Sequence, residues 1–237
     1  MSVLIVGASR GLGRALAAGL AHAGHEVVGV ARTVPEGETS ETRWIAADLA
    51  RPSEAAERIA AGAGPEVDTI IWNVGIWERD AFSAAYDFTA PGAEHDAEIE
   101  TLITTNVTAA VVVLRRLLPA LLRHEQRRVI ITGSTSGLRG SGRPEVAFGA
   151  SKHAIHGIAD ALREGYRAER LAVTTLQLGY LNTEDGLDVP EREAAERGAG
   201  TLIPVHDVVK VVRTLLELSP VAFVRDLTLP AILDERF

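Results

Sequence analysis

Short apolar runs rich in β-branched residues alternate along the chain with longer segments whose apolar residues recur at helical spacing. This alternation is typical of a parallel sheet whose crossover helices cover both faces. The predicted strands span Val3–Val6, Glu26–Ala31, Arg43–Ala46, Val67–Trp72, Arg127–Thr132, Leu171–Leu178 and Val221–Leu229. The predicted helices span Leu12–Ala23, Pro52–Ala61, Ala97–Arg123, Val146–Ala168 and Pro204–Leu216. The pattern therefore predicts an α/β fold, one doubly wound domain over residues 1–237 with about seven parallel strands and helices on both faces.

Composition excludes several classes of site. A chain of 237 residues that is 46% apolar can bury one large core without a second domain. It has no cysteine, which rules out disulfides and thiolate ligands and fits a reducing cytoplasm. No group of histidines and carboxylates has metal-site spacing, so we expect no metal. A net charge of −8 with scattered arginines argues against binding to nucleic acid.

Neither a secretory signal nor a membrane span is expected. The apolar run at the start has no basic segment before it and is too short for a signal. The most apolar later segment, Val107–Leu122, contains Arg115, Arg116 and Pro119, which a bilayer-spanning helix tolerates poorly. The segment is nonetheless apolar almost all round, more than one sheet-facing stripe requires. We therefore expect a cytoplasmic protein in which this helix has a second apolar partner.

A glycine-rich segment, Gly7-Ala8-Ser9-Arg10-Gly11-Leu12-Gly13, joins the first predicted strand to the first predicted helix. Glycines there permit a tight turn and let the backbone approach a pyrophosphate, while the helix N-terminus offers unpaired N–H groups. An ordinary strand-to-helix turn can have the same composition, but the position after the first strand favours a dinucleotide site in a Rossmann-type fold. The spacing differs from G-x-G-x-x-G, so the turn is expected to be longer.

The end of the second predicted strand indicates which dinucleotide binds. A domain specific for NAD has an acidic residue there, which accepts from the ribose 2′-OH. This chain has Ala31-Arg32 instead. Arg32 and Arg10 can contact a 2′-phosphate through charge-assisted hydrogen bonds worth about 1.5–3 kcal/mol each. The two arginines could instead be solvated surface residues, but their positions favour NADP(H).

Together with the later motifs, these features resemble the short-chain dehydrogenase/reductase family over essentially the whole chain. The resemblance implies that Asp48-Leu49 meets the adenine ring and that Asn73-Val74-Gly75 forms the turn after the fourth strand. It also implies that Gly179 and Thr183 hold the nicotinamide amide. Departures from the family pattern are Trp72, Val74 and Leu178. The full expected cofactor set is Gly7, Ser9, Arg10, Gly11, Leu12, Gly13, Arg32, Asp48, Leu49, Asn73, Gly75, Lys152, Gly179 and Thr183.

By the same resemblance, Ser134, Asn106 and Lys152 are the catalytic residues of an NADP(H)-dependent enzyme that interconverts a small-molecule carbonyl compound and an alcohol. Ser134 is expected to contact the substrate oxygen, Lys152 the nicotinamide ribose hydroxyls, and Asn106 a water beside the lysine. Each also has a plainer explanation: a turn cap for Ser134, a helix hydrogen bond for Asn106 and a surface position for Lys152. The three residues occur along the chain in the same order as in the family, which favours the catalytic roles.

Phe148 is the departure that matters most, because the family has its catalytic tyrosine four residues before the lysine. Residues four apart share one helix face, so Phe148 is expected to point toward the site that Lys152 serves. The family protonates the substrate oxygen from the tyrosine hydroxyl, and phenylalanine has no proton to give. Losing a positioned general acid typically costs about 10²–10⁴ in rate, so slow turnover by the usual route is expected.

Three explanations of Phe148 stay open. The chain could be a Tyr→Phe variant of an active enzyme, in keeping with the persistence of Ser134 and Lys152. It could be a divergent enzyme that uses another acid, for which Tyr180 is the nearest candidate. It could also be a non-catalytic NADP(H)-binding sensor or interaction protein, in which Phe148 is a core aromatic residue.

Two long polar segments are the expected specificity regions. Trp77, Phe82, Tyr86 and Phe88 cluster in the segment 77–94, either as walls for an apolar or ring-containing substrate or as the core of a folded loop. The segment 184–201 follows the turn assigned to nicotinamide and is predicted to be a mobile substrate lid. The resemblance also implies a homodimer or homotetramer formed through the helix at 107–122 and the Lys152 helix.

Overall fold

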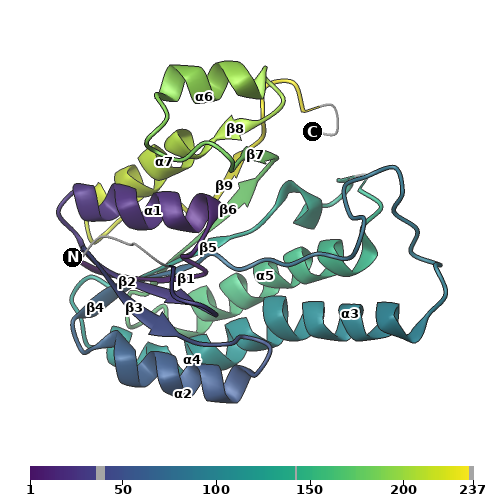
Figure 1. The fold of residues 1–237 in the computed structure, drawn as a ribbon. Helices are drawn as coiled ribbons and strands as arrows, with labels where there is room; N and C mark the ends of the chain where they lie inside the picture. The colour runs from purple at the N-terminus through teal and green to yellow at the C-terminus, as the bar shows by residue number, and fades with distance from the viewer. Residues whose placement is uncertain (36–40, 142, 235–237) are drawn as a thin grey trace.

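The computed structural model describes residues 1–35, 41–141 and 143–234 (Figure 1). Its main sheet has seven strands in the order β3-β2-β1-β4-β5-β6-β9, and every neighbouring pair is parallel. The strands are β1 Ser2–Val6, β2 Glu26–Ala31, β3 Thr42–Ala46, β4 Val67–Trp72, β5 Arg128–Thr132, β6 Ala172–Leu178 and β9 Asp226–Leu229. The predicted doubly wound α/β fold is therefore confirmed. The order reverses between β1 and β4, where such sheets bind ligands at the carboxyl ends of their strands.

Helices cover both faces of this sheet. Figure 1 shows α1 Gly11–His22 and α7 Val205–Glu217 on one face, and α2 Pro52–Ala63, α4 Ala109–Leu121 and α5 Val146–Gly165 on the other. Side chains of β1 alternate between the two layers: Val3 and Ile5 pack with α1 and α7, while Leu4 and Val6 pack with α2 and α4. Burying a Leu, Ile or Val side chain contributes about 1.5–3 kcal/mol. A slip of one residue would move each of these side chains to the opposite face of the sheet, so their burial fixes the register of β1 against its neighbours.

The predicted helix Ala97–Arg123 is wrong in its start and in its regularity. The helical stretch begins with α3, Ala93–Ile103, continues through a π-helical turn at Thr104–Thr108 and ends with α4. The π turn contains Asn106, whose side chain is bonded to the main chain of Ile76 outside the helix. Apolar spacing carries no sign of such a long-range bond.

Three other segments differ from the sequence predictions. The strand predicted at Val221–Leu229 pairs with β6 only over Asp226–Leu229, because the apolar residues before it form an exposed turn. The last helix turn predicted before Ala168 is absent, since α5 ends at Gly165, a poor helix former. The segment 184–201, in which no helix was predicted, contains α6 Glu191–Gly198. Two short strands flank the segment, β7 Leu181–Asn182 and β8 Ile203–Pro204.

The helix Ala93–Leu121 has the length and composition of a membrane span when it is considered alone. In the fold its α4 half packs on the sheet, with Val113, Leu117 and Leu121 buried in the core. It is therefore a core helix of the α/β domain. α2 lies against α4 and covers part of the apolar surface that exceeds a single stripe, whereas Val111 is 48% exposed.

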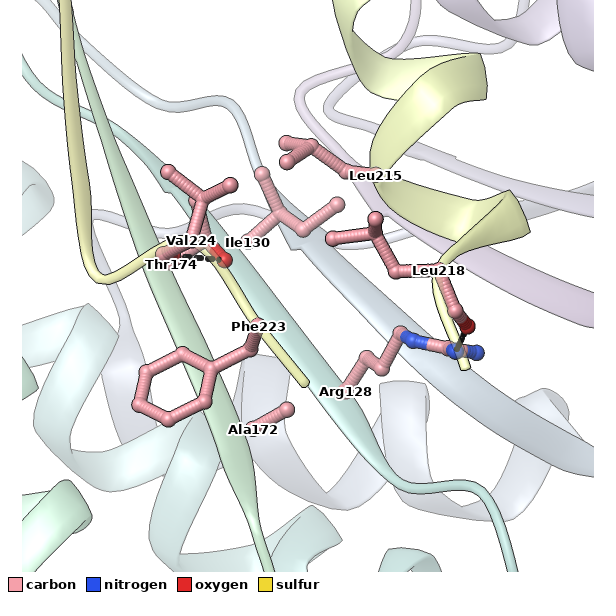
Figure 2. A pocket seen from close by; sticks show the side chains of 8 residues that line it. All are labelled: Arg128, Ile130, Ala172, Thr174, Leu215, Leu218, Phe223 and Val224. Carbon is pink, nitrogen blue, oxygen red and sulfur yellow. Dashed lines mark hydrogen bonds between the residues drawn. The ribbon is translucent and has the colours of Figure 1, made fainter. Parts of the chain in front are cut away.

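A small hollow lies at the amino ends of β5 and β6, lined by Arg128, Ala172 and residues of the α7–β9 region (Figure 2). Its volume is about 10 Å³, room for about one water molecule. The carboxyl ends of the strands, where the predicted site residues lie, are at the opposite edge of the sheet. This hollow is therefore separate from the candidate site.

Candidate active site

The turn between β1 and α1 is too tight for any residue larger than glycine at two positions. A Cβ atom on Gly7 would lie 2.2 Å from the main-chain oxygen of Asn73, and one on Gly13 would lie 1.9 Å from that of Gly7. Gly7 also has φ +88°, a conformation that other residues rarely adopt. No side chain caps α1, and its first turn has no acidic residue. The N–H groups there are therefore available to an anionic group such as a pyrophosphate.

Asn73 ties this turn to the middle of the sheet. Its Nδ2 donates to the Gly7 carbonyl at 3.0 Å, and its Oδ1 accepts from Thr132 Oγ1 at 3.2 Å. The side chain thus joins the ends of three neighbouring strands, β1, β4 and β5. Asn73 consequently shapes the floor on which a cofactor would lie.

Arg32 and Asp48 follow β2 and β3 at the same edge of the sheet. Arg10 and Arg32 are exposed, and neither makes an ion pair within the described ranges. Asp48 accepts from the N–H of Ala50 at 3.1 Å, and Leu49 packs against the core. The segment 36–40, which follows Arg32, lies outside the described residues. Both arginines are therefore available to a phosphate.

The turn after β6 approaches the glycine-rich turn. The Gly179 N–H donates to the Leu229 carbonyl at 2.9 Å, and a Cβ on Gly179 would lie 3.1 Å from Pro230 Cα. A Cβ on Gly11 would lie 3.2 Å from Thr183 Cβ. Thr183 therefore lies against the phosphate turn, so one extended ligand could touch both.

Lys152 lies under the loop that follows β4. Its Nζ donates to the carbonyls of Val74 at 3.0 Å and Thr132 at 3.3 Å, and a Cβ on Gly75 would lie 3.0 Å from it. The side chain is only 5% exposed, and burial lowers the pKa of Lys152 from 10.5 to about 8. At neutral pH it is still an ammonium that can donate to ligand hydroxyls.

Phe148 lies on the same face of α5 as Lys152, as its spacing predicts. Lys152 Nζ is 5.7 Å from the centroid of the Phe148 ring. The ring is buried and meets the edges of Phe82 and Trp77 at centroid distances of 5.1 and 6.4 Å. The position that would carry a tyrosine hydroxyl thus has an apolar ring surrounded by other rings.

Ser134 caps a short 3₁₀ turn, Thr135–Gly137, that follows β5. Its Oγ accepts from the Ser136 N–H at 3.1 Å, and its own N–H donates to Gln177 Oε1 at 3.1 Å. The cap orients the hydroxyl, and no described residue accepts its hydrogen. Ser134 can therefore be a turn cap and still donate a hydrogen bond to a substrate oxygen.

The Asn106 side chain is bonded to the loop after β4 and to α5, and its role beside a water stays a prediction. Its Nδ2 donates to the Ile76 carbonyl at 2.8 Å and to Ser151 Oγ at 3.0 Å, while its Oδ1 accepts from the Ile76 N–H at 2.9 Å. Both side-chain donors are taken. The side chain therefore fixes the loop after β4 against α5, and offers no donor to a water or ligand.

Sequence reasoning missed the buried charges around α5. Glu78 Oε1 accepts from the N–H groups of Ala147 at 2.7 Å and Phe148 at 3.2 Å, so its carboxylate lies at the positive end of α5. Arg143 forms a buried ion pair with Asp234 at 3.2 Å and donates to Tyr180 Oη at 2.6 Å. These partners are 69, 91 and 37 positions apart in sequence, and no spacing rule reaches so far.

An aromatic cluster flanks Phe148, and only part of it was expected. Phe82 meets Trp77 at 5.8 Å, Phe148 at 5.1 Å and Tyr180 at 5.9 Å, each edge to face. Of the other residues predicted to be walls, Tyr86 is bonded to Glu78 instead, and Phe88 is exposed. In the described part of the chain, no group of three His, Cys, Asp or Glu residues could hold a metal ion.

Known proteins resemble this chain in sequence and in fold. Residues 1–194 match the family described as short chain dehydrogenase. The NADPH-dependent pterin aldehyde reductase of Arabidopsis thaliana is 35% identical over 195 residues, which is 77% of this chain and 76% of that protein. A 3-oxoacyl-(acyl-carrier-protein) reductase of Aggregatibacter actinomycetemcomitans is 29% identical over 196 residues, 77% of each.

Solved structures agree on the fold. Serine dehydrogenase from Escherichia coli has a TM-score of 0.76 at 19% identity and covers 97% of each chain. The Pseudomonas aeruginosa RhlG/NADP active-site complex has a TM-score of 0.77 at 22% identity and covers 97% of this chain and 94% of that one. With a family match over residues 1–194 and a relative that is 35% identical, the chain belongs to the short chain dehydrogenase family of oxidoreductases.

Proposed function

We propose that this oxidoreductase transfers hydride between NADP(H) and a small-molecule carbonyl or alcohol. The observation that carries the proposal is that Ser134, Lys152 and the uncapped turn at Gly7–Gly13 meet at one edge of the sheet. NADPH supplies the hydride when it is bound. The protein's own groups supply the rest: Lys152 donates to the ribose hydroxyls, and Ser134 donates to the substrate oxygen.

The choice of NADP(H) over NAD(H) rests on Arg10 and Arg32. Both are exposed and without an ion-pair partner among the described residues, next to the turn that would hold the pyrophosphate. A 2′-phosphate would gain charge-assisted hydrogen bonds from both. The Arabidopsis relative is named as NADPH-dependent, and the Pseudomonas structure is a complex with NADP, which supports the same choice.

The aromatic cluster favours a substrate that carries a planar ring. Trp77, Phe82 and Phe148 bring together rings from the loop after β4 and from α5. The turn that Ser134 caps lies against the same helix, since a Cβ on Gly137 would lie 2.8 Å from the main chain of Lys152. Edge-to-face contacts with such rings contribute about 0.5–1.5 kcal/mol each beyond burial. The pterin aldehyde named for the Arabidopsis relative is a ring-bearing aldehyde of this kind. We further propose that the segment 184–201, which includes α6, forms a lid over the substrate site of this protein.

The test is a titration with NADPH and NADH followed by turnover on matched aromatic and aliphatic carbonyls. We expect tighter binding of NADPH, its oxidation by aromatic aldehydes or ketones, and loss of turnover in Lys152→Met, which keeps the buried volume. Comparable NADPH oxidation by the Lys152→Met form would contradict the proposed site.

A second candidate function rests on Phe148, which removes the family's proton donor. In that case the chain binds NADP(H) and signals its presence without reducing anything. NADPH binding without turnover by the unmodified chain and by Phe148→Tyr would favour this sensor role over the reductase.

A further inference from the structure

Carbonyl reduction needs one proton for each hydride, and the residue at the usual donor position has none. Hydride addition forms a C–H bond and leaves negative charge on the substrate oxygen. That oxygen must then form an O–H bond with a proton from a group within reach. The group must also recover a proton from solvent before the next turnover.

The other proton-bearing groups near Phe148 are poorly suited to this cycle. Tyr86 Oη is already occupied, because it accepts from the Val146 N–H at 3.0 Å and donates to Glu78 at 3.2 Å. Glu145 is only 3% exposed, and one of its oxygens accepts from the Phe82 N–H. Lys152 is nearly as buried and is held by two main-chain carbonyls. None of the three is both uncommitted and open to water.

Tyr180 meets both conditions. It follows Gly179 at the carboxyl end of β6, and its ring packs against Phe82, which in turn packs against Phe148. Its Oη accepts a hydrogen bond from Arg143 at 2.6 Å, and no described residue accepts the hydroxyl's own hydrogen. The residue is 37% exposed, so water can return a proton to it.

Arg143 is placed to stabilise the charge that remains after the proton leaves. Its guanidinium carbon lies 4.4 Å from the centroid of the Tyr180 ring while one of its N–H groups donates to Oη. The arginine side chain is itself buried and fixed by Asp234, so it holds this position without ordering on each turnover. A cation with a charge-assisted hydrogen bond to a phenolate oxygen is a strong local stabiliser.

We propose that Tyr180 is the proton donor of this enzyme, with Arg143 as its positioning residue; the inference rests on the proposed reductase function. The Tyr180 O–H bond breaks as the substrate O–H bond forms, the carbonyl is reduced and NADPH is oxidised. The phenolate pairs with Arg143 and then takes a proton from water. Substrate would lie between Ser134 and Tyr180, beside the Phe82 ring.

The experiment compares single-oxygen deletions at two tyrosines. Tyr180→Phe keeps the ring that packs on Phe82, while Tyr166→Phe removes a hydroxyl at the distant end of α5 and serves as the matched control. With an aromatic aldehyde that the unmodified chain reduces, we expect kcat of Tyr180→Phe to fall by about 10²-fold or more, with the Kd for NADPH unchanged. The residual rate should rise with the concentration of buffer acid, which a purely structural defect would not cause.

The double variant Tyr180→Phe/Phe148→Tyr separates the outcomes. Recovery of turnover there shows that the missing function was proton donation. A kcat for Tyr180→Phe equal to that of Tyr166→Phe overturns the inference and leaves the reductase function standing. An inactive unmodified chain with an active Phe148→Tyr form also overturns Tyr180 as donor. If neither form turns over although both bind NADPH, the reductase function itself fails.

Discussion

Burial of Lys152 should make the stability of the cofactor-free protein rise with pH. Burial lowers the pKa of Lys152 from 10.5 to about 8 in the folded state, whereas the unfolded chain keeps the ordinary value. Below pH 8 both states are protonated, and the full cost of the buried ammonium is present. Between pH 8 and 10.5 the unfolded chain binds more protons, so the free energy of unfolding increases. The gain from this lysine between pH 7 and pH 10 is about 2.5 kcal/mol.

Urea denaturation at pH 7, 8, 9 and 10 measures this gain when the unmodified chain is compared with Lys152→Met. The substitution also removes hydrogen bonds to Val74 and Thr132, but that loss shifts the variant by a similar amount at every pH. The quantity to follow is therefore the difference between the two proteins as pH rises. The chain's other lysine, Lys210, is exposed and paired with Glu191, and Lys210→Met is the control.

Between pH 7 and pH 10, we expect the free energy of unfolding of the unmodified chain to rise by about 2.5 kcal/mol relative to that of Lys152→Met. Relative to Lys210→Met, we expect no comparable rise. A difference that stays flat across this range would mean that Lys152 keeps an ordinary pKa. The account of a desolvated ammonium beneath the loop after β4 would then be wrong.

Four further outcomes test other parts of the structure. NADPH should bind at least about tenfold more tightly than NADH, and Arg32→Asp should narrow or reverse that ratio in calorimetric titrations; equal affinities in the unmodified chain would refute the assignment. Because Tyr180 is proposed to supply the proton, Phe148→Tyr should change NADPH oxidation by little, and a rise of about 10²-fold would show that the unmodified chain lacks a proton donor. Gly13→Ala should abolish NADPH binding, because the new Cβ would lie 1.9 Å from a main-chain oxygen. The control Gly157→Ala, which has open space around it in α5, should bind NADPH normally and have a higher melting temperature. Light scattering at micromolar concentration should show a dimer or tetramer, since Val111 leaves apolar surface exposed on α4, and a monomer would contradict that expectation.

Local patterns were enough to predict the layers of this fold. The central strands are continuous apolar runs because helices cover both of their faces, and the structure has them within a residue or two of their predicted bounds. Glycines at 7 and 13 were recognisable from their spacing after the first strand, although the main-chain atom that excludes a side chain at Gly7 belongs to Asn73. The offset between Phe148 and Lys152 is equally local, since both lie on α5.

What the sequence could not reveal depends on contacts between distant segments. The π turn at Asn106 follows from bonds to Ile76, thirty positions away. α6 was missed for a different reason, because its sequence is mostly charged and shows no apolar stripe at helical spacing. Tyr180 could be named as a nearby acid, but its hydrogen bond from Arg143 could only be seen once both segments were placed.

The Glu78 carboxylate makes the start of α5 depend on the loop after β4. It is the acceptor for the first amides of the helix that carries Phe148 and Lys152. A loop transplanted from a relative to change substrate preference would remove that acceptor unless it brought an equivalent carboxylate. The helix would then begin with unpaired buried amides, each costing about 1–3 kcal/mol. A replacement loop in this protein should therefore keep a carboxylate at the position of Glu78. Without it, we expect the start of α5 to become less ordered together with any change in substrate preference.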